Sequence, residues 1–427
     1  MKARTLFDLT ASLSDAAMVF GCISAVVKDT DAVSAADFRV EPIEGIPVDF
    51  IRGVDISSVL AAEAGGVMYR DFSGVPQDIF KTLAEAGVNY IRIRVWNDPF
   101  VRQWDLDHGA PEEWFGKSYG GGNCDAENAR KIGERIVTAN AVTGAGMKLF
   151  VDFHYSDFWA DPARQRVPKA WDGMDIDAKK IAIAEYTEEA LTLIASSGVS
   201  IGMVQIGNEI NNGMAGEQGD GVFELLKAAG AAVRKVSPNS RIVIHYTNPE
   251  VINAHINRAK ALGENSVDYD IFATSYYPEW HGTLANLKTE LSKVKAAYPN
   301  KDILIAEYGS RLEIEEAVSH DLLNAEAGTH PATVQWQADA MRDAIAVAVE
   351  LGFIGLCYYE PAWIALPAHN TVETWEKHGY GWANVFACMY DMPNVGETGS
   401  PDSSRALFFD DGRPKSALNV FKDVYSE

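Results

Sequence analysis

Two glutamates, Glu209 and Glu307, are the residues of this sequence whose placement most directly suggests chemistry. Glu209 follows Asn208 in "VQIGNEI", and Glu307 lies in "DILIAEYGS". Each acid comes at the end of an apolar run typical of a β-strand. A strand leaving a core would more simply continue apolar or turn, so an acid at that point indicates a polar site at the strand ends.

Glycoside hydrolysis needs two carboxyl groups, one on either side of the bond that is cleaved. At a separation of about 5 to 5.5 Å, one carboxylate attacks the anomeric carbon while the other first donates and later removes a proton. Two negative charges at that separation repel by about 3 kcal/mol at an effective dielectric constant of about 20, which is about two pKa units. One member of the pair must therefore stay protonated near neutral pH.

Eight β-type runs alternate with longer segments in which apolar residues recur at helical spacing and a Gly stands near the end. One such helical segment is "GVPQDIFKTLAEAGVN". This alternation predicts parallel strands joined by helices. The runs are residues 50–60, 90–96, 148–157, 204–210, 241–248, 270–278, 302–310 and 353–363.

Two α/β architectures fit this order: a (β/α)8 TIM barrel and a doubly wound open sheet. An open sheet is expected to carry a Gly-rich phosphate-binding turn after an early strand, but "GGGNCD" (120–125) has no apolar strand directly before it. The sequence therefore favours the barrel, as a single catalytic domain. The active site of a barrel lies at the C-terminal ends of its strands.

Nearly every predicted strand ends in polar or aromatic residues. Each one alone has an ordinary explanation, since a carboxylate beside Arg is usually a structural ion pair and a Trp in a barrel usually packs. Their collection at one end of a barrel is better explained by an active site. In chain order they are Asp55, Arg92, Arg94, Trp96, Asp152, His154, Asp157, Asn208, Glu209, His245, Asn248, Tyr276, Tyr277, Glu307, Glu360 and Trp363.

The composition points to a neutral partner. The chain has 427 residues, and its 60 acidic against 37 basic residues give a formal charge of -23. Such a surface repels nucleic acid and anionic membranes. The four cysteines are widely spaced and form no CxxC pair, so we expect free, mostly buried thiols and neither a zinc site nor a dense disulfide framework.

Residues 1–45 are predicted to be an N-terminal extension, and residues 46–427 the barrel domain. The extension begins with a basic "MKAR" and holds an apolar run, 16–27, of about the length of a signal peptide core. "VFGC" loosely resembles a lipoprotein signal with Cys22 as the lipidated residue. We therefore expect an extracellular or cell-surface protein, or a cytoplasmic one if this segment is not a signal. The run is too short to span a bilayer, and no other segment approaches the required length.

Six ordered blocks and a closing segment resemble glycoside hydrolase family 53, the arabinogalactan endo-β-1,4-galactanases of the clan of retaining (β/α)8 hydrolases. The resemblance runs from about Phe50 to about Phe421 and implies an endo-acting hydrolase whose partner is a polysaccharide, β-1,4-galactan. The blocks are "FIRGVDISSVL", "GVNYIRIRVWNDPF", "LFVDFHYSDFWADPARQRVPKAW", "MVQIGNEINNGM", "SYYPEWHGTL" and "YYEPAWI", and the closing segment is "ALFFDDGRPKSALNVF".

The resemblance also implies roles for individual residues. Glu209 would be the acid/base, Glu307 the nucleophile, and Asn208 a hydrogen-bond partner of the sugar 2-hydroxyl. Residues expected around the nucleophile are Arg92, His154 and Tyr277. Residues expected to bind substrate are Asp55, Trp96, Asp152, Tyr276, Trp280 and Trp363, with Trp280 or Trp363 stacking on the apolar face of galactose.

Three segments depart from the family pattern. The loop after Glu307, "SRLEIEEAVSHDLLNAEAGTH", lacks the closely alternating carboxylates of a calcium loop, so neither calcium nor another cofactor is predicted. "YGS" replaces the usual residues directly after Glu307. "NGMAGEQGDG" lacks the Trp that often follows the acid/base segment, which leaves open the subsites for the leaving group.

Three other functions fit parts of the pattern. The same chemistry could act on another β-linked polysaccharide, such as a mannan or a glucan. A carbohydrate-binding protein without activity could use the same scaffold. A metal-dependent hydrolase could use Asp152, His154 and His245. We expect a monomer.

Overall fold

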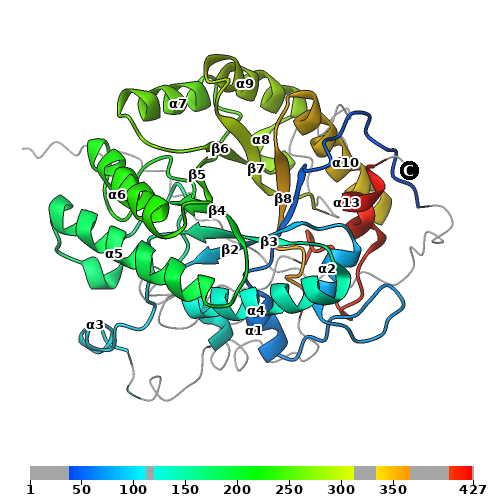
Figure 1. Ribbon diagram of the computed structural model, residues 1–427, viewed down its shortest axis with the longest axis horizontal. Helices are drawn as coiled ribbons and strands as arrows, with labels where there is room; N and C mark the ends of the chain where they lie inside the picture. The colour runs from blue at the N-terminus through cyan, green and yellow to red at the C-terminus, as the bar shows by residue number, and fades with distance from the viewer. Residues whose placement is uncertain (1–37, 111, 113–119, 312–332, 366–402, 426–427) are drawn as a thin grey trace, which may run out of the picture. The chain divides into compact units, whose positions relative to one another are not determined.

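Eight parallel strands close into a barrel in chain order, with β8 paired to β1 (Figure 1). The structure is a computed structural model that describes residues 38–110, 112, 120–311, 333–365 and 403–425. The predicted (β/α)8 barrel is confirmed. The strands are β1 Ile51–Asp55, β2 Tyr90–Val95, β3 Lys148–Phe153, β4 Ile201–Ile206, β5 Arg241–Tyr246, β6 Ile271–Tyr276, β7 Asp302–Tyr308 and β8 Gly355–Tyr359.

Helices connect the strands and lie around the outside of the barrel (Figure 1). Local residues set their ends: Asp125 caps α4 by accepting from the Asn128 amide, and Gly144, at φ +73°, ends it. The helices are α1 Val59–Ala64, α2 Ile79–Glu85, α3 Arg102–Asp107, α4 Ala126–Thr143, α5 Ile176–Ala195, α6 Asp220–Val236, α7 Ala254–Glu264, α8 Pro278–His281, α9 Leu284–Ala297, α10 Val334–Glu350 and α13 Val420–Asp423.

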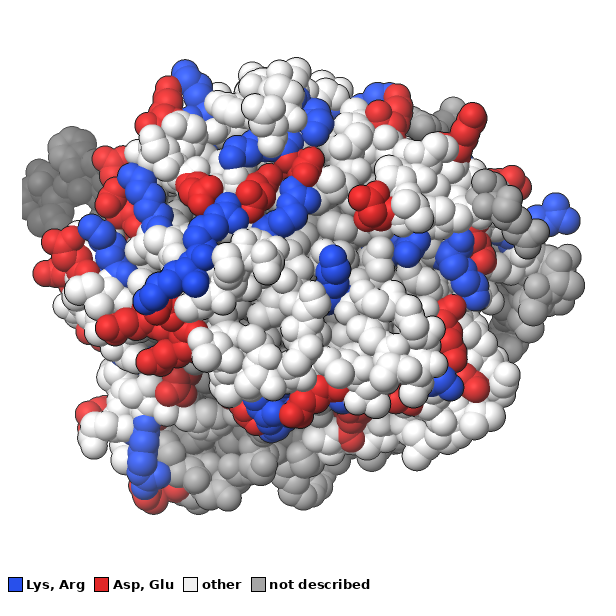
Figure 2. Space-filling model, in the orientation of Figure 1, with Lys and Arg blue, Asp and Glu red and all other residues white. Residues whose placement is uncertain are grey.

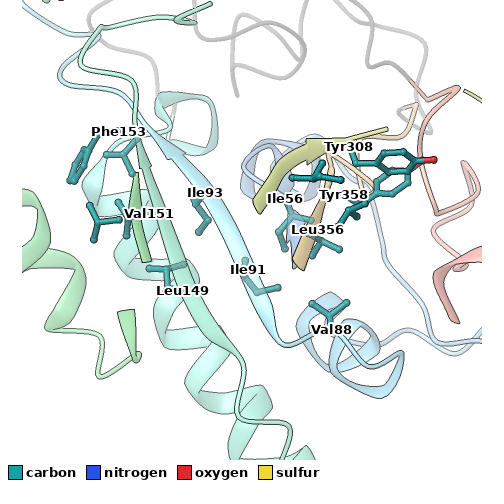
Figure 3. Packing of buried hydrophobic residues seen from close by; sticks show 14 of the residues in the cluster. Ile56, Val88, Ile91, Ile93, Leu149, Val151, Phe153, Tyr308, Leu356 and Tyr358 are labelled. Carbon is teal, nitrogen blue, oxygen red and sulfur yellow. The ribbon is translucent and has the colours of Figure 1, made fainter. Parts of the chain in front are cut away.

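The strands bury apolar residues on both faces, as parallel strands covered by helices must. An outer layer between strands and helices includes Ile91, Ile93 and Val151 (Figure 3). The second layer fills the barrel interior, so the barrel is packed rather than open. This interior layer is Ile51, Phe150, Met203, Val243, Ile271, Ala273, Leu304, Ala306 and Cys357.

A β-bulge in β7 breaks the alternation of side chains between the two layers. Ala306 belongs to the interior layer, so alternation would send Glu307 outward and bring Tyr308 inward. Instead Tyr308 lies in the outer layer, 5.7 Å from Tyr358 between ring centroids (Figure 3). The register of β7 shifts against both neighbours at this point, and Ala306 and Glu307 both face the interior.

The chain from Phe38 onward packs against the barrel. Ile43 is buried, and its amide donates to the Val424 carbonyl over 2.8 Å. Residues 1–37 and the predicted lipidation position Cys22 lie outside the described residues. The predicted extension, its processing and the location of the protein therefore stay predictions.

The cysteines, the surface charges and the helices of the described residues can be compared with the expectations from composition. Cys124 and Cys357 are buried free thiols, as expected, and Cys388 lies outside the described residues. Figure 2 shows Lys and Arg interspersed with Asp and Glu on one face. Among the helices that the structure describes, none has the length and apolar character needed to cross a membrane.

Candidate active site

The chain turns sharply after β4, where Asn208 and Glu209 stand. Gly207 has φ +101°, and a Cβ there would come within 2.7 Å of Ile210 and 2.8 Å of Met214, so only glycine fits. Glu209 itself has φ +44°, which is uncommon for a residue with a side chain. Backbone strain of this kind is concentrated at functional sites.

Glu307 is held between two donors. Its Oε1 lies 2.9 Å from Arg92 Nη1, and its Oε2 accepts from the Tyr277 hydroxyl over 2.8 Å. The side chain is 6% exposed. Burial is the largest influence and raises the pKa of Glu307 above its ordinary value, while the charge of Arg92 and the hydrogen bond from Tyr277 oppose this rise. The two donors stabilise Glu307 as a carboxylate.

Glu209 has no such cationic partner among the described residues. Burial first, and then the negative charge of Glu307, raise the pKa of Glu209 to about 8. Its Oε1 lies 2.5 Å from Ser275 Oγ, and Ser275 is the register partner of Glu307. The pair is thus arranged to be asymmetric at neutral pH, with the proton on Glu209 and the charge on Glu307.

Arg92 ties the two sides of the site together. Its Nη1 contacts Asp55 Oδ2 over 2.9 Å in addition to Glu307. Its Nη2 donates to Asp152 Oδ2 over 2.8 Å and to Asn208 Oδ1 over 3.0 Å. A buried guanidinium with several oxygen partners fixes their positions through its rigid geometry.

Four residues that are expected to bind substrate are buried. Asp55 and Asp152 are at most 1% exposed, and Trp96 and Tyr276 are fully buried. The acids bind Arg92, while the Tyr276 hydroxyl donates to the Gly282 carbonyl. The structure therefore shows these four residues buried, and direct contact with substrate stays a prediction for each of them.

His154 contacts Asp152, and two residues, Asp152 and Arg92, link it to Glu307. Its Nδ1 accepts from the Ala160 amide over 3.0 Å and from Trp96 Nε1 over 3.3 Å, so Nε2 carries the hydrogen. That nitrogen lies 3.2 Å from Asp152 Oδ2. His154 is thus linked to the nucleophile through Asp152 and Arg92.

The two tryptophans expected to stack on the sugar, Trp280 and Trp363, differ in exposure. Trp280 is 44% exposed, stands edge to face with Tyr277 at 5.4 Å, and has the Arg405 guanidinium 4.7 Å above its ring. Trp363 is 6% exposed, and its centroid lies 6.5 Å from that of Trp159 at an interplanar angle of 28°. Exposed Trp280 is the better placed of the two predicted tryptophans to meet a polymer.

Comparison with known proteins decides the family. The model of glycosyl hydrolase family 53 matches residues 51–421. The chain belongs to this family. It is 40% identical to an endo-beta-1,4-galactanase of Bacillus subtilis over 437 residues, which cover 99% of this chain and 97% of that protein. It is 32% identical to a probable arabinogalactan endo-beta-1,4-galactanase A of Aspergillus fumigatus, over 73% of this chain and 84% of that protein.

Solved structures agree with the assignment to family 53. The catalytic domain of an Ignisphaera aggregans member of this family has a TM-score of 0.74 at 36% identity, covering 91% of this chain and 100% of its own. A structure of fungal beta-1,4-galactanases has a TM-score of 0.64 at 24% identity, covering 86% and 98%, and shows the shared fold.

Several residues of this family 53 site were not singled out in the sequence. Gln205 links Arg92 to Asn208, and Ser275 contacts Glu209. Both occupy interior positions by simple alternation from Met203 and Ala273, so alternation could have found them. Arg405 could not be found in this way, because it comes from the C-terminal segment, far from any strand.

A second ion pair beside the site joins Arg94 and Glu360. Arg94 Nη1 lies 2.6 Å from Glu360 Oε1, which also accepts from Ser58 Oγ over 2.7 Å. Burial raises the pKa of Glu360 to about 7. The Arg94 guanidinium lies 4.1 Å above the Trp159 ring. These contacts orient Trp159 against Trp363.

Metal ligation was the alternative proposed for Asp152, His154 and His245. Among the residues that the structure describes, no three His, Cys, Asp or Glu side chains are grouped to hold a metal ion. The segment compared with a calcium loop lies mostly within 312–332, outside the described residues.

Proposed function

We propose that this protein is a retaining endo-β-1,4-galactanase with Glu307 as nucleophile and Glu209 as acid/base. The observation that carries the proposal is the unequal surroundings of the two carboxyls. Arg92 and Tyr277 stabilise Glu307 as a carboxylate, while burial and the charge of Glu307 raise the pKa of Glu209 to about 8. The names of the most similar relatives support galactan as substrate.

In the first step the Glu307 carboxylate attacks the anomeric carbon. Glu209 donates its proton to the glycosidic oxygen, which keeps the electron pair of the breaking carbon–oxygen bond. The products are a sugar ester on Glu307 and a shortened chain that leaves. Esterification removes the negative charge of Glu307, and with it one of the two main causes of the raised pKa of Glu209.

In the second step Glu209 acts as a base. Its pKa is now lower, so it is a carboxylate that removes a proton from water as the water oxygen attacks the anomeric carbon. The ester bond to Glu307 breaks, and the carboxylate returns to Arg92 and Tyr277. Two inversions at the same carbon leave the β-configuration unchanged.

Trp280 is the proposed aromatic contact for the polymer. A galactose ring with an axial 4-hydroxyl leaves one apolar face for an aromatic ring. Trp280 is 44% exposed and is braced by Tyr277 and Arg405. Trp363, less exposed, is proposed as the floor beneath the cleaved sugar.

The test uses linear β-1,4-galactan with the purified parent and three variants. We expect oligosaccharides from the parent, with the β-anomer formed first in proton NMR spectra, and very little product from Glu307→Gln or Glu209→Gln. Glu224→Gln is the control and should match the parent, because this α6 side chain is 42% exposed and its partner is the surface residue Lys227. Intact galactan with the parent, or equal rates for Glu307→Gln and the parent, would refute the proposal. Mannan and glucan in parallel test the other β-linked substrates.

We also propose that the protein acts outside the cell or at its surface. A galactan polymer is too large to enter a cell intact, and the basic start and apolar run of residues 1–27 fit an export signal. N-terminal sequencing of protein from its native host tests this. A mature chain that still begins at Met1 contradicts it.

A further inference from the structure

A chain of hydrogen bonds leads from Arg92 to Glu209 through three buried side chains. Arg92 Nη2 donates to Asn208 Oδ1 over 3.0 Å, and that oxygen lies 2.8 Å from His245 Nδ1. His245 Nε2 lies 3.0 Å from Ser275 Oγ. Ser275 Oγ lies 2.5 Å from Glu209 Oε1. His245 and Ser275 are fully buried, so two facing donors or two facing acceptors would be costly.

The donor directions are fixed from the Arg92 end, because a guanidinium can only donate. Asn208 Oδ1 faces Arg92 and also accepts from Gln205 Nε2 over 2.9 Å, while Asn208 Nδ2 donates to the Ala160 carbonyl over 2.8 Å. Turning this amide over would place its NH2 group against Arg92 and its oxygen against the Ala160 carbonyl. Asn208 Oδ1 is therefore an acceptor, and its 2.8 Å contact with His245 Nδ1 requires a hydrogen on that nitrogen. Gln205 Nε2 also lies 3.2 Å from His245 Nδ1, but its two hydrogens are directed to the shorter contacts with Asp152 Oδ1 and Asn208 Oδ1.

His245 is neutral and thus has one hydrogen to place. Burial, followed by the positive charge of Arg92, holds the pKa of His245 well below its usual range. With its hydrogen on Nδ1, Nε2 is an acceptor, and the described atom that faces it is Ser275 Oγ. Ser275 therefore donates its hydroxyl hydrogen to His245. The hydrogen of the 2.5 Å contact between Ser275 and Glu209 then belongs to Glu209.

Given the acid/base role proposed for Glu209, we propose that Ser275 and His245 are positioning residues that keep the catalytic proton on Glu209 in the free enzyme. Glu209 donates to Ser275, Ser275 to His245, and His245 to Asn208. For Glu209 to ionise in place, Ser275 must turn its hydroxyl from His245 to the carboxylate. That turn leaves His245 Nε2 buried without a donor, so the chain favours the protonated acid.

One hydrogen bond of this chain, the one donated by Ser275, changes its acceptor during the reaction. When substrate is bound, a turn of the Glu209 carboxyl about its Cγ–Cδ bond presents the proton to the glycosidic oxygen. That oxygen takes the proton and keeps the electron pair of the broken bond, and Ser275 turns its hydroxyl to the new carboxylate. In the second step the proton taken from water restores the bond from Ser275 to His245. The chain therefore favours Glu209 as the base of the second step.

His245 is neutral, so a neutral side chain in its place removes no charge from the surroundings of Glu209. A shift in the pKa of Glu209 in such a variant is thus transmitted through Ser275. The charged or titratable groups that act on Glu209 are Glu307, Asp161 and Tyr277, and Thr247 forms a hydrogen bond with it in addition to Ser275. The charged or titratable groups that face His245 are Arg92, His154, His255 and His281.

The decisive variant is His245→Asn. Its amide nitrogen takes the place of Nδ1 and keeps the bond to Asn208, but nothing reaches Ser275. Ser275 is then free to donate to the Glu209 carboxylate, so we expect the alkaline limb of kcat/KM on galactan to move to lower pH by about one unit. If the bonds ran the other way, the variant would weaken donation to the carboxylate. An alkaline limb that moves to higher pH, or that does not move, overturns the proposal.

A double variant shows whether Ser275 carries the effect. In the Ser275→Ala background the further change His245→Asn should leave the alkaline limb where Ser275→Ala alone puts it. A shift as large as in the parent background would mean that His245 acts on Glu209 by another route, and the proposal would be wrong.

Two measurements separate this proposal from the acid/base role itself and from loss of folding. Azide should rescue Glu209→Ala on an aryl β-galactobioside, and failure of rescue counts against the acid/base role. Rescue together with an unmoved limb in His245→Asn counts against the hydrogen-bond chain alone. Neutron diffraction on the parent at mildly acidic pH needs no variant. Deuterium on His245 Nδ1 and not on Nε2 is expected, and the reverse overturns the proposal.

Discussion

Ser275 on β6 is the register partner of Glu307 on β7, although Thr274 pairs with a residue two positions before Glu307. The bulge at Ala306 accounts for the skipped residue and turns Glu307 into the barrel. Ser275 also lies 2.5 Å from Glu209. The bulge in β7 therefore places Glu307 beside the same residue, Ser275, that contacts Glu209.

Loss of the proton from Glu209 should cause the alkaline limb of the profile of kcat/KM against pH. Because its pKa is raised to about 8 by burial and by Glu307, kcat/KM on galactan should fall as pH rises through about 8, where the acid loses its proton. Glu360 has a pKa of about 7 and titrates nearby. An aryl galactobioside with a good leaving group needs little proton donation, so its rate should keep a weaker limb if Glu209 is the cause. An equally steep limb on both substrates would assign it to another group.

The hydroxyl of Tyr277 should set the acid limb. Tyr277→Phe removes a donor to the charged form of Glu307, so the pKa of Glu307 rises and the acid limb of kcat/KM moves to higher pH. A hydrogen bond to a charged group contributes about 1.5–3 kcal/mol, which corresponds to about one to two pH units. Tyr276→Phe is the matched control, because that hydroxyl bonds to the Gly282 carbonyl. Equal shifts in both variants would contradict the assignment.

Much of this arrangement was predictable from the sequence. Apolar runs and helical spacing locate eight strands, and the position of an acid at a strand end locates Glu209 and Glu307. The rule that side chains alternate between the two faces of a strand would place Glu307 outside, because Ala306 is interior. No residue in "LIAEYGS" predicts the bulge that turns Glu307 inward. The full burial of Trp96 shows a related limit, because strand position alone cannot tell an exposed ring from a buried one.

Contacts between residues far apart in the chain could not be predicted from the sequence either. Arg92 was expected near the nucleophile, but its bond to Asn208 joins strands whose side chains meet only once the barrel closes. Arg405 reaches Tyr277 from a segment about a hundred residues beyond β7, with its guanidinium 5.3 Å above the ring. Local pattern carries no information on such distant pairs.

Gly207 should be required for stability as well as for the site. Gly207→Ala adds a Cβ 2.7 Å from Ile210 at φ +101°, so both strain and overlap should lower the free energy of unfolding, by about 2–4 kcal/mol. Gly198→Ala is the control, since Gly198 has φ +80° but no neighbour within 4 Å and so reports backbone strain alone. Urea denaturation measures both. Equal losses would show that the contacts with Ile210 do not matter.

Glu209→Gln should stabilise the protein while it abolishes activity on galactan. Burial and the charge of Glu307 raise the pKa of Glu209 from its ordinary 4.5 to about 8, so the folded protein holds this proton more tightly than the unfolded chain. The stability that this provides is fully present below about pH 4.5 and is lost as pH rises to about 8, by about 1.4 kcal/mol per unit and less where solvent reaches the carboxyl. Gln cannot ionise, so the variant should gain in melting temperature over the parent between these pH values and gain no more above them. Thermal melts from acid to alkaline pH measure the difference, and a gain independent of pH would show that the pKa of Glu209 is not raised.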